Sequence, residues 1–205
     1  MARRKKKSRE PRQAVIITVT GTTGTGKTWF TRNLILEQIP GPKLLLTKAG
    51  MQQGWENIPI IDSSKKSDWE YDTGIRHVLW MQHGKDTARH ILKYSRDKTL
   101  ILDDAKEFIP ANLEQYQDIK WIFSAHRHLG ADMVFIAHSI NDIPPQAWMY
   151  TKLSFVFHTD DMLKSSVRTS RAKRFRAAQD RVTRRYQEAY QKGKAVYGIY
   201  ELVGP

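Results

Sequence analysis

The fold is decided by residues 14–28, which read AVIITVT followed by GTTGTGKT. The first seven residues are mostly β-branched and end at a glycine, which is typical of a buried parallel strand. Residues 29–38 then show an apolar pattern at helical spacing, which ends at Pro40-Gly41-Pro42. The sequence therefore predicts a strand, a glycine-rich loop and a helix in direct succession.

The loop itself matches G-x-x-x-x-G-K-[ST] at every fixed position, the pattern of a phosphate-binding loop. Its glycines let successive backbone N–H groups converge on a phosphate, and the following helix adds the positive end of its dipole. Lys27 is expected to reach the β- and γ-phosphate oxygens, and the Thr28 hydroxyl to bind Mg²⁺. The predicted nucleotide-binding residues are Gly21, Thr22, Thr23, Gly24, Thr25, Gly26, Lys27 and Thr28. ATP or GTP hydrolysis is the predicted activity, and no residue distinguishes adenine from guanine.

A pair of carboxylates follows the apolar run at residues 99–102. Asp103 is the candidate for the Mg²⁺ site, and Asp104 for the base that orients or deprotonates the attacking water. Because aspartate is shorter than the glutamate usual at the second position, Glu107 is a rival for the base. A structural alternative is an acid pair that caps the next helix.

Two further polar residues flank the apolar run at residues 132–137. His138 follows the run, where open α/β sheets bind ligands, and could sense the γ-phosphate. Arg127 precedes the run and is expected too far from its own nucleotide, so it could act in a neighbouring subunit as an arginine finger. The alternative is that Arg127 is an ordinary surface residue.

The remaining pattern alternates short apolar runs with helical stretches. Strands are expected at residues 43–47, 58–61, 77–80, 99–102, 132–137, 153–157 and 195–200, and helices at 86–94, 113–126 and 171–191. This alternation predicts an α/β protein with a mostly parallel central sheet in three layers. We expect one domain over residues 14–205, ending in a basic helix at about 170–192 and a final strand.

The chain carries a net charge of +13, with 34 lysines and arginines against 21 acids among 205 residues. Such an excess attracts polyanions, of which nucleic acid is the usual one and an anionic membrane surface the next. Residues 1–13 hold seven cations and one acid, and are expected to form a disordered basic arm. The helix at 171–191 places cations opposite its apolar stripe, and the candidate DNA contacts there are Arg174, Arg181, Arg184 and Arg185. A merely solvated basic face is the alternative.

No cysteine is present, which excludes disulfides and thiolate metal sites. No apolar run approaches the roughly 18 to 20 residues that span a bilayer. We therefore expect an intracellular protein without a membrane span.

The order of these motifs resembles the FtsK–HerA superfamily of DNA-pumping ATPases. The phosphate loop, the Asp103-Asp104 strand end, the Arg127-x-x-Gly130 segment and the strand ending at His138 carry the resemblance. Within the superfamily, the chain looks most like viral genome-packaging ATPases, and it is also similar to zonular occludens toxin-like assembly ATPases of filamentous phages. The toxin-like branch usually carries a membrane-spanning segment, so its absence here favours the packaging branch.

The resemblance implies a RecA-like P-loop fold and an ATPase that uses ATP and Mg²⁺. It implies a homo-oligomeric ring, a hexamer by analogy, that moves single- or double-stranded viral DNA and contacts capsid or portal proteins in the host cytoplasm and the virion. Asp104 stands where the family has its catalytic glutamate, and His138 stands where glutamine is usual. Two other functions remain open: a small-molecule kinase, and a nucleotide-controlled switch with little hydrolysis.

Overall fold

The computed structural model describes residues 14–48, 53–80, 90–91, 93–104, 106, 117–143, 145–164 and 171–204. Along the chain, the elements are β1 (Ile16–Thr20), α1 (Lys27–Phe30), η1 (Thr31–Ile35), α2 (Leu36–Gln38), β2 (Lys43–Lys48), α3 (Lys66–Trp69), β3 (Ile75–Trp80), β4 (Thr99–Asp103), α5 (Gln117–Leu129), β5 (Asp132–Ala137), η4 (Ile140–Asp142), α6 (Pro145–Tyr150), β6 (Thr151–Phe157), α7 (Ala172–Gln191) and β7 (Tyr200–Val203).

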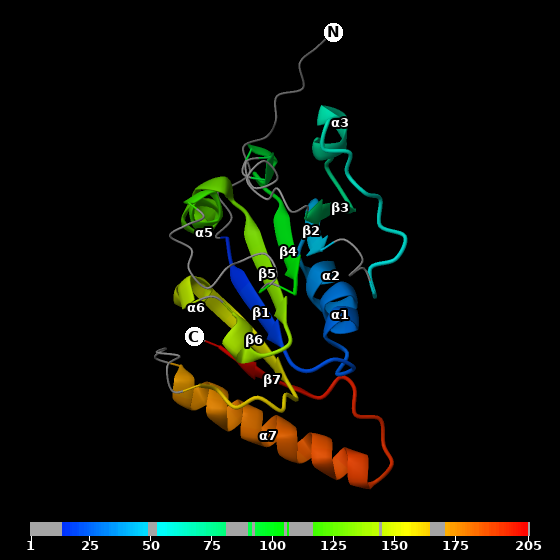
Figure 1. Cartoon of the computed structure of the whole chain (residues 1–205), viewed down its shortest axis with the longest axis vertical. Helices are drawn as coiled ribbons and strands as arrows, with labels where there is room; N and C mark the ends of the chain where they lie inside the picture. Colours follow the sequence, from blue (N-terminus) through cyan, green and yellow to red (C-terminus); the bar gives the residue numbers. More distant parts are fainter. Residues whose placement is uncertain are drawn as a thin grey trace.

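The strands form one seven-stranded sheet in the order β3-β2-β4-β5-β1-β6-β7 (Figure 1). Every neighbouring pair is parallel except β6 and β7, which are antiparallel. The mostly parallel sheet predicted from the sequence is therefore confirmed. Strand β1 lies inside the sheet between β5 and β6, so the loop that follows it opens at the centre of one sheet edge.

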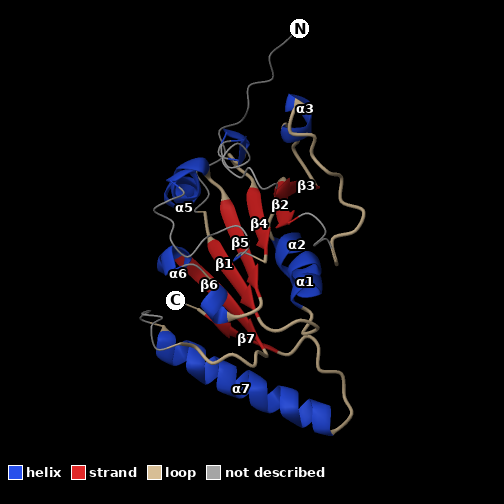
Figure 2. Cartoon of the chain, in the orientation of Figure 1, coloured by secondary structure: helices blue, strands red, loops and turns tan. Residues whose placement is uncertain are grey.

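Helices cover both faces of the sheet, which gives the predicted three layers (Figure 2). Successive residues of a strand point to opposite faces, and the buried residues accordingly separate into two clusters. One cluster packs Val19 and Ile136 of the sheet against Phe30 and Leu36 of the helical run after β1. The other cluster packs strand residues against Ile122 of α5, Trp148 of α6 and Phe175 of α7, among others.

Two of the expected strands differ from the structure. Residues 58–61 form no strand and contribute a single bridge between Ile60 and His77, because Pro59 lacks the N–H that a ladder requires. The last strand begins at Tyr200 rather than at residue 195. Before it, the N–H of Gly198 donates to the carbonyl of Thr25, 3.0 Å away, instead of to a strand.

The helices agree better with the sequence pattern. The helical run after β1 starts two residues earlier than expected, at Lys27, and contains a π-helical turn over Thr31–Ile35. The expected helix at 113–126 is described from Gln117 and continues to Leu129. Helix α7 matches the expected basic helix within two residues at each end.

Several expectations fall outside the described residues. These are the basic arm at residues 1–13, Glu107, and most of the helix at 86–94, of which residues 90–91 and 93–94 are helical. In the part of the chain that the structure describes, no helix combines the length and apolarity needed to cross a membrane.

Candidate nucleotide-hydrolysis site

The glycine-rich loop is anchored to the strands on both sides of β1. The N–H of Gly21 donates to the carbonyl of Ala137 at 3.1 Å, and the N–H of Thr22 donates to the carbonyl of His158 at 2.8 Å. Gly21 has a φ of +156° and lies so close to β6 that an added Cβ would be 2.5 Å from the Cβ of Phe157. Only glycine fits there, and the loop consequently begins tightly against the sheet.

Lys27 is folded back onto its own loop. Its Nζ donates to the carbonyl of Thr22 at 2.8 Å, and the Thr25 hydroxyl donates to the same carbonyl at 2.8 Å. Burial lowers the pKa of Lys27 to about 8, against the opposing effect of the nearby carboxylates of Asp103 and Asp104. The loop thus holds a partly desolvated cation where a phosphate would bind, since the first N–H groups of α1 also have no partner within the helix.

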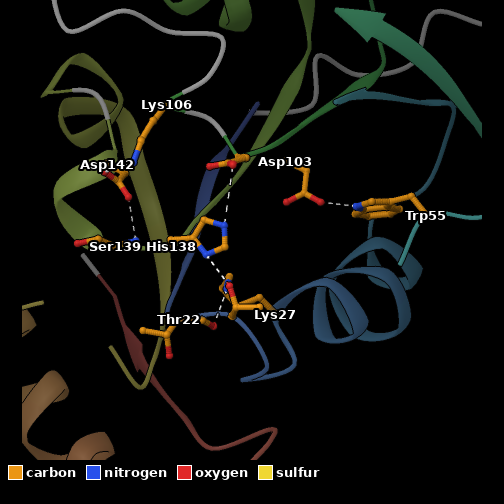
Figure 3. A network of polar contacts seen from close by, with 10 residues as sticks. Thr22, Lys27, Trp55, Asp103, Lys106, His138, Ser139 and Asp142 are labelled. Atoms are coloured by element: carbon orange, nitrogen blue, oxygen red, sulfur yellow. Dashed lines mark hydrogen bonds and ion pairs between the residues drawn. The ribbon is translucent and has the colours of Figure 1, made fainter. Parts of the chain in front are cut away.

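Asp103 ends β4 and is held by an indole. The Nε1–H of Trp55 donates to Oδ2 of Asp103 (Figure 3). Trp55 is buried in the hydrophobic cluster that also contains Phe30 and Leu36 of the helical run after the loop. Burial raises the pKa of Asp103, while the hydrogen bond from Trp55 and the charge of Lys27 act in the opposite direction. No sequence pattern indicates a role for Trp55, because it lies in the irregular segment between β2 and α3.

Asp104 lies next to Asp103 in a left-handed backbone conformation, with a φ of +60°. Its Oδ2 is 3.9 Å from Nε2 of His138, whose Nδ1 is 3.3 Å from the hydroxyl of Thr23. Figure 3 shows the imidazole of His138 between the strand ends and the glycine-rich loop. The buried Oδ1 of Asp104 has no hydrogen-bond partner within the described residues, so it could accept one from a water molecule.

These residues fit a magnesium–nucleotide complex. Magnesium is usually bound by one or two carboxylates together with substrate phosphates and water. Thr28 supplies a hydroxyl at the start of α1, and Asp103 supplies a carboxylate at the end of β4. Oδ1 of the neighbouring Asp104 is an acceptor for which the described residues supply no donor. Among the described residues, there is no cluster of three or more His, Cys, Asp or Glu side chains that could bind a metal ion. A metal ion here would therefore also need oxygen ligands from the nucleotide or from water.

Arg127 lies away from this group. It is an exposed residue of the last turn of α5, and its carbonyl accepts from the N–H of Gly130, just before β5 begins. Its guanidinium lies 5.5 Å from the centre of the Tyr150 ring. Arg127 and His138 therefore flank opposite ends of β5, as the sequence predicts, and Arg127 does not join its own site.

The basic residues of α7 are divided between two environments. Arg181 and Arg185 pair with Glu201 of β7 at 3.1 Å and 2.9 Å, so they fasten the helix to the edge strand. Glu201 was not predicted as their partner, because it lies on a separate element. Arg174 and Arg184 are exposed on the same helix. Of the four candidate DNA contacts, Arg181 and Arg185 therefore share Glu201 as an acidic partner.

A cavity of about 630 Å³ lies beside the loop, between Thr23, His138 and the start of the segment after β6. Its lining includes His158, which stacks on Tyr186 of α7 with ring centres 3.9 Å apart. Tyr186 and His158 are far apart in the sequence, and no local sequence pattern brings Tyr186 near the loop. The end of α7 accordingly lies close to the candidate site.

Comparison with solved structures is consistent with this geometry. The genome-packaging NTPase B204 from Sulfolobus turreted icosahedral virus 2, in complex with AMPPCP, matches with a TM-score of 0.61 and 13% identity over 94% of this chain and 93% of that chain. B204, the DNA-packaging ATPase from Sulfolobus turreted icosahedral virus, matches with a TM-score of 0.59 and 15% identity over 95% and 94%. The chain has the fold of these packaging NTPases.

The predicted RecA-like P-loop fold and the resemblance to packaging ATPases are thereby confirmed as a likeness of fold. The amino-terminal domain of zonular occludens toxin from Neisseria meningitidis also matches, at 16% identity over 73% of this chain and 80% of that chain, but its TM-score of 0.46 supports no argument. No protein-family model matches the sequence, and the search for related curated proteins gave no match.

Proposed function

We propose that this protein is a Mg²⁺-dependent, DNA-translocating ATPase that packages a viral genome. The observation that supports this most is the meeting of Lys27, Asp103, Asp104 and His138 at one edge of the sheet, in a fold shared with packaging NTPases that bind ATP analogues. A binding loop alone would suit many functions, whereas an adjacent carboxylate with an unpaired oxygen suits hydrolysis.

In this proposal, each residue has a distinct role. The loop and Lys27 bind the phosphates, Thr28 and Asp103 hold Mg²⁺, and Asp104 orients the attacking water. The bound metal ion would neutralise charge on the phosphates. His138 contacts both Asp104 and Thr23, so it links the water-positioning group to the loop. Lys27 must exchange the carbonyl of Thr22 for phosphate oxygens when nucleotide binds.

The site is completed by a second copy of the chain. Arg127 is exposed at the far end of β5, so in a closed ring it would meet the site of the next subunit rather than its own. A guanidinium supplied in this way would stabilise negative charge that develops during phosphoryl transfer. A hexameric ring with DNA in its channel, docked on a capsid or portal vertex, is the assembly that we propose.

Steady-state ATP hydrolysis tests this proposal in the wild type, Lys27→Ala and Arg127→Ala, each with and without double-stranded DNA. We expect DNA to stimulate the wild type and both variants to be at least about a hundredfold slower, since an arginine finger contributes on the order of 10³ to 10⁵. Arg76→Ala is the matched control, because its guanidinium also lies 5.5 Å from a tyrosine ring, that of Tyr71.

Mixing the two inactive variants distinguishes a shared site from a damaged one. A subunit with Arg127→Ala keeps its own Lys27 and can receive Arg127 from a neighbour with Lys27→Ala, so activity should return in the mixture. Absence of DNA stimulation together with full activity of Arg127→Ala would contradict the translocase, and a screen of small-molecule phosphate acceptors would then test a kinase.

A further inference from the structure

The turn at Gly54 and Trp55 contacts both residues that the proposed function assigns to Mg²⁺. The Nε1–H of Trp55 donates to Oδ2 of Asp103, and only 1% of the Trp55 surface is exposed. Gly54 packs on Thr28: an added Cβ would lie 2.7 Å from Cγ2 of Thr28. Two consecutive residues of one turn therefore touch the hydroxyl-bearing and the carboxylate-bearing ligand.

This turn is fixed from the helix that follows the phosphate loop. Nη1 of Arg32, in the π-helical turn, donates to the carbonyl of Gly54 at 2.8 Å. The N–H of Gly54 donates to Oε1 of Glu56, also at 2.8 Å. Gly54 has a φ of +85°, so another residue would be strained as well as too close to Thr28. Both peptide groups of Gly54 are thus held, and the direction of the Trp55 side chain follows from them.

Holding one oxygen of a carboxylate has a chemical consequence. A carboxylate whose Oδ2 accepts from a rigid, buried indole loses rotation about its last bond, and its other oxygen then points in a defined direction. Hydrogen bonds of this kind orient metal-binding carboxylates and tune their affinity. Since Asp103 is at the end of β4 and Thr28 at the start of α1, the turn contacts the ends of two different elements.

We propose that Trp55, supported by Gly54, is a positioning residue that sets the geometry of Thr28 and Asp103 for Mg²⁺. Trp55 touches neither nucleotide nor metal and acts through Asp103. The inference rests on the proposed function, because it presupposes that Thr28 and Asp103 bind the metal. It adds a residue that no sequence motif identifies and that the segment between β2 and α3 supplies.

Binding of AMPPCP by the full chain tests the inference, measured in EDTA and in excess Mg²⁺. Trp55→Phe keeps a buried ring and removes only the N–H. The affinity of Trp55→Phe for AMPPCP in EDTA should stay within about twofold of the wild type. The factor by which Mg²⁺ increases that affinity should be about tenfold smaller than in the wild type. The affinity for Mn²⁺ of the AMPPCP complex, followed by electron paramagnetic resonance, should weaken by the same factor.

Trp69→Phe is the matched control. Trp69 is equally buried, but its indole nitrogen has no hydrogen-bond partner within the described residues, so the same change removes no bond. In Trp69→Phe, Mg²⁺ should increase the AMPPCP affinity by the same factor as in the wild type. The inference is wrong if Mg²⁺ increases the AMPPCP affinity of Trp55→Phe as much as that of the wild type. It is also wrong if Trp55→Phe loses as much AMPPCP affinity in EDTA as in Mg²⁺. A wild type without any Mg²⁺ gain would instead contradict the proposed function.

A second measurement leaves Trp55 in place, in case Trp55→Phe does not fold. The chain has six tryptophans, each of which should give one indole N–H signal in a ¹⁵N-labelled sample. One signal should lie downfield because it donates to a carboxylate, and Asp103→Asn should move it upfield. The same signal should shift when Mg²⁺ is added with AMPPCP. Six indole signals unaffected by Asp103→Asn would overturn the inference.

Discussion

The imidazole of His138 joins Asp104 to Thr23, with Nε2 3.9 Å from Oδ2 of Asp104 and Nδ1 3.3 Å from the hydroxyl of Thr23. One ring thereby connects the end of β4 with the phosphate loop across β5. Any displacement of Thr23 by a bound γ-phosphate would reach Asp104 through a single side chain.

Two substitutions of His138 should distinguish its polar contacts from the volume that its ring fills. His138→Gln keeps polar atoms that can reach both partners, so kcat should remain within about fivefold of the wild type. His138→Ala removes both contacts and should lower kcat on the order of a hundredfold, the scale of losing one preorganised polar contact. Steady-state hydrolysis at saturating ATP measures both, and equal rates for the two variants would contradict the role.

Nucleotide affinity should depend on pH through Lys27. Burial lowers the pKa of Lys27 to about 8, so in the free protein the cation is present below pH 8 and is lost as the pH rises above it. Because phosphate binding requires the charged form, affinity for ADP in EDTA should fall about tenfold from pH 7 to pH 9. Isothermal titration at these two values checks this. In Lys27→Met the decrease should be absent, and a persisting decrease would assign it to another group.

Releasing Arg181 and Arg185 should strengthen DNA binding if α7 contacts DNA. Glu201→Gln removes the acid that pairs with both arginines. Each additional phosphate contact should steepen the dependence of log K on log salt concentration by about 0.9. Fluorescence anisotropy with labelled duplex DNA at several salt concentrations measures this slope.

The control for that experiment is Glu188→Gln, which removes one exposed negative charge from the same helix but frees neither arginine. Its slope should equal that of the wild type. Identical slopes for Glu201→Gln and Glu188→Gln would show that the arginines of α7 do not contact DNA. The loss of two exposed ion pairs should itself cost less than about 1 kcal/mol each of unfolding free energy.

Two glycines of the loop should differ in their effect on stability. An alanine at Gly21 would place its Cβ 2.5 Å from Cβ of Phe157, whereas one at Gly24 would have no atom of the described residues within 4 Å. Both positions have positive φ, so both variants carry backbone strain. Overpacking adds about 1 to 3 kcal/mol. Urea unfolding should therefore show Gly21→Ala to be less stable than Gly24→Ala by about that amount, and equal stabilities would contradict the close packing at Gly21.

The sequence was sufficient wherever local pattern determined the outcome. The β-branched run before Gly21, the helical period after Lys27 and the acid pair at Asp103 place the loop, its helix and the second strand end, because each signal is contained within a few residues. The helix at 171–191 was likewise expected to have an apolar stripe, and α7 buries Phe175, Ala178, Gln179 and Val182.

What the sequence could not show depends on contacts between distant residues. Trp55 reaches Asp103 across 48 positions, and Arg181 reaches Glu201 across 20. Neither pair leaves a periodic signal. The expected start of the last strand at residue 195 was wrong for a similar reason: Gly198 donates to Thr25, 173 residues earlier, so long-range hydrogen bonding overrides local strand preference there.

The hydrogen bond between Gly198 and Thr25 also has a consequence for folding during synthesis. Strand β1 and the loop leave the ribosome early, yet their neighbours β5 and β6, and the turn that contacts Thr25, are synthesised more than a hundred residues later. Loop closure over such separations is slow compared with local helix formation. The glycine-rich loop is thus among the first segments translated and among the last to gain all its contacts, and a nascent chain halted before Gly198 would lack the hydrogen bond to Thr25.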